Sequence, residues 1–272
     1  MLVFPKAKIN LGLRITGKRT DGYHEIETLF YPVNLCDALE IVPNTKGSEK
    51  DILILTGYSL EGKPEENLVL RAVEKLRGEF QIPSVRIHLH KNIPPGAGLG
   101  GGSSDAAFML RAMNRLFGLS LGTDDLKVIA AGLGSDCPFF IDCQPSFASG
   151  RGEILKPADC FLTGFYGVLI NPGILISTRE AYDECIRAMP VKPLAELLNK
   201  PVSQWKELVT NDFEKTIFRK HPPIAMIKQT LYDSGAFYSS MSGSGSTVYG
   251  IFDKKPDIHE NLKKHIIFMG EL

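Results

Sequence analysis

The chain has 272 residues, 43% of them hydrophobic and 23% charged, which is enough for one large or two medium-sized globular domains. Its 31 lysines and arginines balance 31 acidic residues, so no basic field is present to hold a nucleic-acid backbone. The longest largely apolar stretch, residues 161–170, is too short to span a membrane, and Pro5-Lys6 comes too early for a signal-peptide core. We therefore expect a cytoplasmic protein that binds neither nucleic acid nor membrane. The five scattered cysteines fit neither a disulfide framework nor a zinc site.

Residues 3–42 alternate in a manner typical of β-structure. In the first strand Lys8 and Asn10 are two residues apart and share one face, opposite the apolar residues. They are either a solvent-facing pair or a functional one, and because Lys6 lies on the same face, spacing alone does not select the lysine.

A polar turn over residues 17–22 ends beside Tyr23 and His24. Their adjacent rings could stack on a flat heteroaromatic ligand, or Tyr23 could simply cover the core. A strand is predicted over residues 51–56, and apolar spacing predicts a helix over residues 68–76 with Asn67 as its N-cap.

The most informative stretch is Pro94–Ser104, where five glycines fall among eleven residues. It follows an alternating strand at residues 85–90 and precedes a helix that runs to Phe117, with Ser103 or Ser104 as the expected N-cap. Unpaired backbone N–H groups at the start of a helix form an anion site, so we expect a phosphate to bind there.

Three interpretations of this stretch remain open at this point. The glycines could serve only a tight turn. Gly96, Gly98 and Gly101 also satisfy G-x-G-x-x-G, but residues 123–126 follow where a dinucleotide fold places its acidic residue, and these read as the start of another helix. A nucleoside triphosphate loop would fit as well, although no lysine follows the glycines, so any lysine on the phosphates must come from elsewhere.

A second helix is predicted over residues 123–131, and Asp136 then stands alone in an apolar segment. A carboxylate placed there is an N-cap, a functional group or both, because an unpaired buried charge is costly. The neighbouring Cys137 reads as a small buried residue or as a reactive thiol.

Polar turns are predicted on both sides of residue 155, before a new strand begins. We therefore place a domain boundary there, with domains at 1–157 and 158–272. The second half predicts a strand, a helix over residues 178–188, short helices to residue 220, a helix over 223–234, two strands and a terminal helix. This order suits a ferredoxin-like antiparallel sheet. Residues 241–246, between the last two strands, form either a hairpin turn or a second phosphate cradle.

Together these segments resemble the GHMP small-molecule kinases, whose phosphate loop has the form P-x-x-x-G-L-G-S-S-A. The triple glycine at 100–102 and the segments 7–11, 21–25, 66–68, 133–136 and 242–245 are most similar to the branch that acts on a cytidine-diphosphate-linked methylerythritol. The resemblance implies an α+β two-domain fold, with a ribosomal protein S5 domain 2-like N-terminal domain and a ferredoxin-like C-terminal domain. It also implies transfer of phosphate from ATP, with Mg²⁺, to the substrate's 2-hydroxyl, in the non-mevalonate route to isoprenoids.

The same resemblance assigns residues to roles. Lys8 and Asp136 match the catalytic pair, with Asp136 as general base; Asn67 matches the adenine end of the ATP site, and Ser104 is a possible metal contact. The phosphate loop comprises Pro94, Pro95, Gly96, Ala97, Gly98, Leu99, Gly100, Gly101, Gly102, Ser103 and Ser104. The substrate-binding residues are Asn10, Tyr23, His24, Thr178, Tyr182, Ser242 and Gly243.

Two features depart from the family pattern: Lys6 is inserted before Ala7, and Asp105 replaces a common asparagine and puts a negative charge near the phosphates. The alternatives are another GHMP kinase of the homoserine or mevalonate type, a non-catalytic nucleotide sensor, and, more distantly, a nicotinamide dehydrogenase. We expect a monomer or a weak homodimer whose partner is its small-molecule substrate.

Overall fold

The computed structural model describes residues 1–20, 22–44, 50–60, 62–159, 162–182 and 192–272. The chain forms two compact units that interleave along the sequence. The first unit comprises Met1–Ala7, Leu35–Pro95 and Gly100–Gln144, and the second comprises Lys8–Asn34, Gly96–Leu99 and Pro145–Leu272. The boundary at residue 157 stays a prediction. None of the described helices combines the length and the apolar character needed to cross a membrane.

The first unit contains a sheet of four strands in the order β1 (Leu2–Val3), β4 (Ala38–Pro43), β6 (Val85–Lys91) and β5 (Ile52–Gly57). β5 and β6 are parallel, and the other pairs are antiparallel. Along β6 the apolar residues are buried and Arg86, His88 and His90 are exposed, as the period of two predicts. The strands predicted over residues 51–56 and 85–90 are confirmed.

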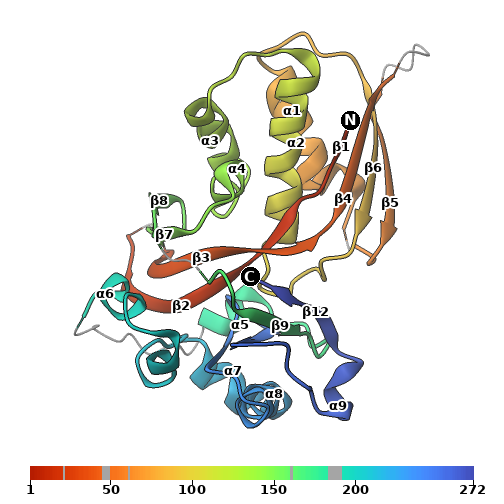
Figure 1. Ribbon diagram of the computed structural model, residues 1–272. Coiled ribbons are helices and arrows are strands. Elements are labelled where there is room, and N and C mark those ends of the chain that lie inside the picture. Colours follow the sequence, from red (N-terminus) through yellow and green to blue (C-terminus); the bar gives the residue numbers. More distant parts are fainter. Residues whose placement is uncertain (21, 45–49, 61, 160–161, 183–191) are drawn as a thin grey trace. The chain divides into compact units, whose positions relative to one another are not determined.

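Helices α1 (Leu68–Arg77) and α2 (Gly101–Phe117) lie side by side against this sheet (Figure 1). The apolar stripe of α1 is buried, and the Asn67 side chain accepts a hydrogen bond from the Val69 N–H at 2.9 Å, so both the helix and its cap are confirmed. The first unit also contains η1 (Pro64–Glu66), α3 (Thr123–Ala131) and α4 (Phe139–Asp142). The prediction of Ser103 or Ser104 as the N-cap of α2 is wrong: Gly100, at φ 71°, caps the helix and the serines fall in its first turn.

The second unit contains two sheets. One has the order β2 (Lys6–Lys18), β3 (His24–Cys36), β7 (Ser146–Ser149) and β8 (Ile154–Pro157). The other has the order β10 (Tyr238–Met241), β11 (Val248–Phe252), β9 (Tyr166–Ile170) and β12 (Ile266–Glu271), and all its pairs are antiparallel. The order of this second sheet is the ferredoxin-like one, as predicted.

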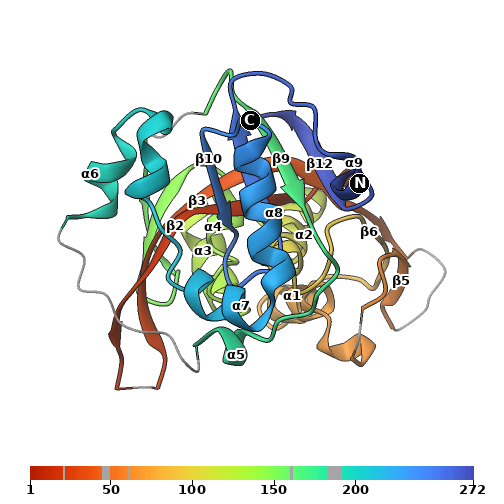
Figure 2. The ribbon, with the colours of Figure 1, turned by 90° about the horizontal axis from the view of Figure 1, so that it is seen from below.

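Helix α8 (Pro222–Asp233) covers the ferredoxin-like sheet and buries Ile224, Ile227 and Leu231 in its core (Figure 2). The remaining helices of this unit are α5 (Thr178–Tyr182), α6 (Leu194–Leu198), η2 (Val202–Glu207), α7 (Glu214–Lys220) and α9 (Glu260–Lys263). The helix predicted over 178–188 begins as expected, and residues 183–191 lie outside the described part. The predicted terminal helix is only the short α9, and a strand that the sequence did not predict follows it, because Ile266–Glu271 pairs with β9 at the edge of the sheet.

Candidate active site

Lys8 and Asn10 are both enclosed on β2, so the interpretation as a solvent-facing pair is wrong. Lys8 is 4% exposed; its Nζ donates to Asn10 Oδ1 at 2.6 Å and lies 4.9 Å from the centroid of the Phe30 ring. Lys6, by contrast, is only half-buried. A buried ammonium needs a polar partner, and Asn10 Oδ1 is one for Lys8.

Asn10 is itself held from several sides. Its Nδ2 donates to Thr28 Oγ1 at 3.0 Å, its backbone oxygen accepts from the Tyr249 hydroxyl at 2.7 Å, and its N–H donates to Ser242 Oγ at 3.3 Å. Sequence reasoning missed Thr28 and Tyr249, because neither stands in a motif: Thr28 acts from the neighbouring strand β3, and Tyr249 acts from β11 of the other sheet of this unit. These contacts hold Asn10 Oδ1, which accepts the hydrogen bond from Lys8 Nζ, in one orientation.

The glycine segment 96–99 and the hairpin 241–246 lie directly against one another within the second unit. Ser242 Oγ donates to the Gly98 oxygen at 2.9 Å, and the Thr247 N–H donates to the Ala97 oxygen at 3.4 Å. The Lys8 N–H donates to the Leu99 oxygen at 3.0 Å, which brings this segment beside β2. The structure thus gathers Lys8, Asn10, Gly96–Leu99, Ser242 and Gly243, all of which the sequence predicts as site residues.

The hairpin is fixed by a residue that the sequence did not single out. Asn211 Nδ2 donates to the backbone oxygens of Met241 and Gly243 at 2.8 and 2.9 Å, and its Oδ1 accepts from the Phe213 N–H. Asn211 is 3% exposed. A buried amide with every contact satisfied restricts the hairpin to one conformation.

In the first unit, the remaining predicted residues gather around the start of α2. Ser103 hydrogen-bonds to the thiol of Cys137, which places the segment containing Asp136 against the first turn of the helix. Burial raises the pKa of Cys137 to about 11, and this disfavours the reactive-thiol interpretation. Asp136 is half-buried, and because α4 begins with Pro138 as its N-cap, the interpretation of Asp136 as an N-cap is wrong.

Asn67 and Ser104 belong to the same region of the first unit. A Cβ on Gly102 would lie 3.9 Å from Leu68 Cδ1, so the helix that Asn67 caps starts next to the glycines. Ser104 is fully buried, and its Oγ has no hydrogen-bond partner among the described residues. A buried hydroxyl without a protein partner can hydrogen-bond to a ligand oxygen or coordinate a cation.

Asp105 does not stand as an isolated charge at the helix start. Its Oδ2 accepts from Lys91 Nζ at 2.6 Å, and Lys91 also pairs with Asp37. Burial raises the pKa of Asp105 to about 7, with Lys91 lowering it and Asp37 raising it.

The aromatic residues form a separate cluster in the second unit. The rings of His24 and Tyr182 stack with centroids 4.5 Å apart and planes 15° apart, and Phe213 meets Tyr182 edge-on. Tyr23 is 56% exposed, so it does not cover the core, and the guanidinium of Arg151 lies 5.0 Å from its ring centroid. Sequence reasoning missed Arg151. Thr178 begins α5, and its side chain is outside the described part.

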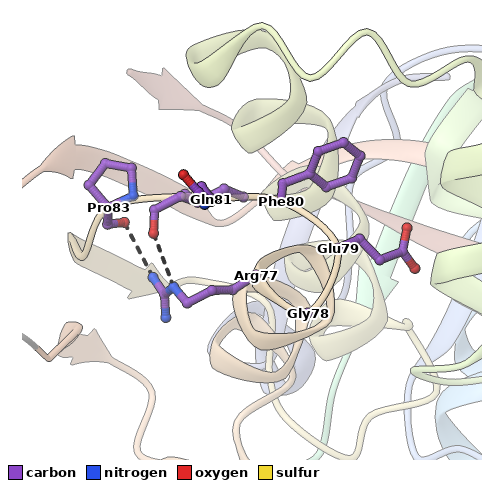
Figure 3. A pocket seen from close by; sticks show the side chains of 7 residues that line it. Arg77, Gly78, Glu79, Phe80, Gln81 and Pro83 are labelled. Atoms are coloured by element: carbon purple, nitrogen blue, oxygen red, sulfur yellow. Dashed lines mark hydrogen bonds between the residues drawn. The ribbon is translucent and has the colours of Figure 1, made fainter.

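A cavity of about 570 Å³ lies elsewhere in the first unit, lined by residues 77–83 (Figure 3). The Arg77 guanidinium donates to the backbone oxygens of Ile82 and Pro83 and pairs with Asp51 at 2.7 Å. None of the predicted site residues lines this cavity. Its cation is already engaged, so we do not assign the substrate site there.

Comparison with known proteins gives consistent results. Residues 67–143 match the family model described as GHMP kinases N terminal domain, and residues 194–266 match GHMP kinases C terminal. A protein of Bacteroides fragilis named 4-diphosphocytidyl-2-C-methyl-D-erythritol kinase is 50% identical over 258 residues, covering 95% of this chain and 94% of that protein. A protein of the same name from Parabacteroides distasonis is 48% identical over 260 residues, covering 96% and 94%.

Solved structures agree with these relatives. A crystal structure of 4-(cytidine 5'-diphospho)-2C-methyl-D-erythritol kinase superposes with a TM-score of 0.76 at 34% identity, over 92% of this chain and 90% of that one. The Methanococcus jannaschii mevalonate kinase superposes with a TM-score of 0.67 at 14% identity, over 97% and 92%, which shows a shared fold only.

Proposed function

Because this chain belongs to the GHMP kinases, in the branch of the 4-diphosphocytidyl-2-C-methyl-D-erythritol kinases, we propose that it phosphorylates the 2-hydroxyl of 4-(cytidine 5'-diphospho)-2-C-methyl-D-erythritol. It is an ATP-dependent kinase whose acceptor is an alcohol, and the products of the proposed reaction are the 2-phosphate and ADP. The observation that carries the proposal is 50% identity to a relative of that name over 95% of the chain.

We propose that Asp136 accepts the proton of the acceptor hydroxyl and that Lys8 stabilises the negative charge that develops on the oxygen. Phosphoryl transfer requires mainly positioned groups and neutralised charge. The enclosure of Lys8 supports its role, because an ammonium held at 2.6 Å from Asn10 Oδ1 is already oriented before substrate binds. The half-buried position of Asp136 supports a carboxylate that can still reach a ligand.

We propose that the backbone N–H groups of the glycine-rich segment bind the ATP phosphates, and that Asn67 lies at the adenine end. The start of α2, a helix of 17 residues, supports anion binding. Mg²⁺ takes most of its ligands from water and substrate phosphates, so its binding does not require a cluster of protein ligands. The described residues contain no group of three His, Cys, Asp or Glu side chains that could hold a metal ion. The unpartnered Ser104 Oγ could supply one ligand oxygen, and the bound metal would neutralise phosphate charge.

We propose that the cytosine of the substrate binds at Tyr23, His24 and Tyr182, and that Asn10, Thr178, Ser242 and Gly243 contact the rest of the molecule. Stacking between His24 and Tyr182 supports this, because two parallel rings offer a face to a pyrimidine. Homoserine and mevalonate have no ring to stack there, which disfavours the alternative kinases. The cytoplasmic location and the monomeric or weakly dimeric state also remain proposals.

Isothermal titration with CDP, with UDP and homoserine as controls, tests the substrate class. We expect CDP to bind, binding to weaken in Tyr23→Ala, and UDP and homoserine to give no heat. A wild-type protein that binds homoserine and ignores CDP would overturn the assignment and favour the alternative kinase.

A further inference from the structure

The glycine-rich segment, Pro94–Ser104, begins and ends in the first unit, and a buried ionic cluster in that unit joins its two ends. The cluster contains none of the predicted catalytic residues. It consists of Lys91, the last residue of β6, Asp37, between β3 and β4, and Asp105, near the start of α2. Their exposed fractions are 3%, 0% and 2%. Groups so deeply buried must be paired, and each ion pair here is in contact.

The contacts reach both ends of the segment. Asp37 Oδ1 accepts from the N–H groups of Asn92 and Ile93 at 2.5 and 2.8 Å, which fixes the chain where it leaves β6. Lys91 Nζ donates to Asp37 Oδ2 and, at 2.6 Å, to Asp105 Oδ2, which fixes α2 where the segment ends. A Cβ at Gly101 would lie 3.3 Å from Lys91 Nζ, so the first residue of α2 rests on the lysine.

The cluster contains one more buried carboxylate than its single ammonium can neutralise, which stability alone does not require. Two carboxylates face one ammonium, so the ionised cluster has a formal charge of −1, and Asp105 Oδ1 is buried with no hydrogen-bond partner among the described residues. Apolar residues of similar size would often be at least as stable as such a buried group. Its specific benefit is orientation, because the lysine ties one carboxylate that holds the start of the loop to another that is part of the helix.

We propose that Lys91, acting through Asp37 and Asp105, is a positioning residue that holds the ends of the glycine-rich segment at the spacing that ATP phosphates require. This inference rests on the proposed function of that segment. Lys91 acts on the loop through its two carboxylates, so the effect of losing it falls on ATP and not on the cytidine end of the substrate.

A charge-matched pair of changes isolates positioning from charge. Lys91→Met with Asp105→Asn removes one positive and one negative charge, so the net charge of the cluster stays at −1 when the wild-type carboxyls are ionised, at pH 8.5. The remaining Asp37 keeps its two backbone donors. We expect ATP to bind about tenfold more weakly, the size of one lost charge-assisted hydrogen bond, while CDP affinity changes less than twofold.

The matched control is the ion pair at the other end of the same strand. Arg77 pairs with Asp51, and Asp51 Oδ1 accepts from the Val85 N–H at 2.9 Å, so this pair holds the start of β6 as Lys91 holds its end. Arg77→Met with Asp51→Asn should lower the melting temperature without changing the ATP affinity more than twofold. Equal losses of ATP affinity in both double variants would reduce the Lys91 cluster to a structural role and overturn the proposal.

Two single substitutions keep the test decisive if the double variant does not fold. Asp105→Asn and Asp105→Ala remove the same charge, but only asparagine keeps an oxygen for Lys91 Nζ. We expect ATP affinity within about twofold of wild type in the first and at least about fivefold weaker in the second. Equal affinities would contradict the proposal, whereas a wild-type protein that fails to bind ATP would contradict the proposed function instead.

Discussion

Replacing Gly98 with alanine tests the contact between the glycine segment and the hairpin at residues 241–246. Gly98 has φ 77°, and a Cβ built on it would overlap the carbonyl oxygen of Ser242 while lying 2.9 Å from that carbonyl carbon and 3.1 Å from the Gly245 oxygen. The atoms in the way are backbone atoms of Ser242 and Gly245, and Asn211 holds the same hairpin through the Met241 and Gly243 oxygens. The hairpin therefore cannot give way as a flexible side chain would.

The expected loss of stability has two parts. The left-handed backbone costs alanine about 1–2 kcal/mol, and overpacking typically costs about 1–3 kcal/mol more. We therefore expect Gly98→Ala to lower the free energy of unfolding by about 2–5 kcal/mol. Gly235→Ala is the matched control, because Gly235 has φ 93° but a Cβ there meets nothing within 4 Å, so only the first cost applies.

Urea denaturation followed by fluorescence measures both variants. The single tryptophan, Trp205, is 2% exposed in the second unit, so its emission reports the unfolding of the unit that contains Gly98 and Gly235. A Gly98→Ala protein as stable as Gly235→Ala would refute the close packing of the two loops.

Three further predictions address chemistry, recognition and pH. Asp136→Asn should lower turnover by about 10² to 10⁴ while ATP still binds; near-normal turnover would remove Asp136 as general base. His24→Ala should weaken CDP binding by at least about fivefold in titration calorimetry, since base stacking contributes about 1–3 kcal/mol, and unchanged affinity would place the cytosine elsewhere. Burial alone would raise the pKa of Asp51, but hydrogen bonds from Arg77 and the Val85 N–H and the charge of Arg77 lower it overall. Asp51 therefore contributes stability above its ordinary pKa that is lost as pH falls through the lowered value, and Arg77→Met should flatten this acid-side loss in urea titrations.

The sequence predicts individual strands and helix caps well, because these depend on residues that are close together in the chain. Alternation along residues 85–90 and the Asn67 cap of α1 both appear as expected. The start of α2 was misplaced because Gly100 adopts a left-handed conformation that propensity does not reveal. The last strand was missed because Ile266 gains its place only by pairing with β9.

Residues that act across the chain were beyond sequence reasoning. Asn211, Tyr249 and Lys91 stand in no motif, and each becomes important only where folding brings distant segments together. The motif residues could be proposed from the sequence because glycines and an isolated carboxylate are unusual on their own, and their roles stay predictions. Burial, which only the folded chain provides, distinguishes Lys8 from Lys6 and supports Lys8 as the proposed catalytic lysine.

The most direct test of the account is to incubate the purified protein with ATP, Mg²⁺ and 4-(cytidine 5'-diphospho)-2-C-methyl-D-erythritol and to follow the reaction by phosphorus NMR. We expect a new phosphomonoester resonance, from the phosphate on the 2-oxygen, that grows in step with ADP. ATP left intact with this substrate, while parallel incubations with homoserine or mevalonate form ADP, would contradict the proposed activity.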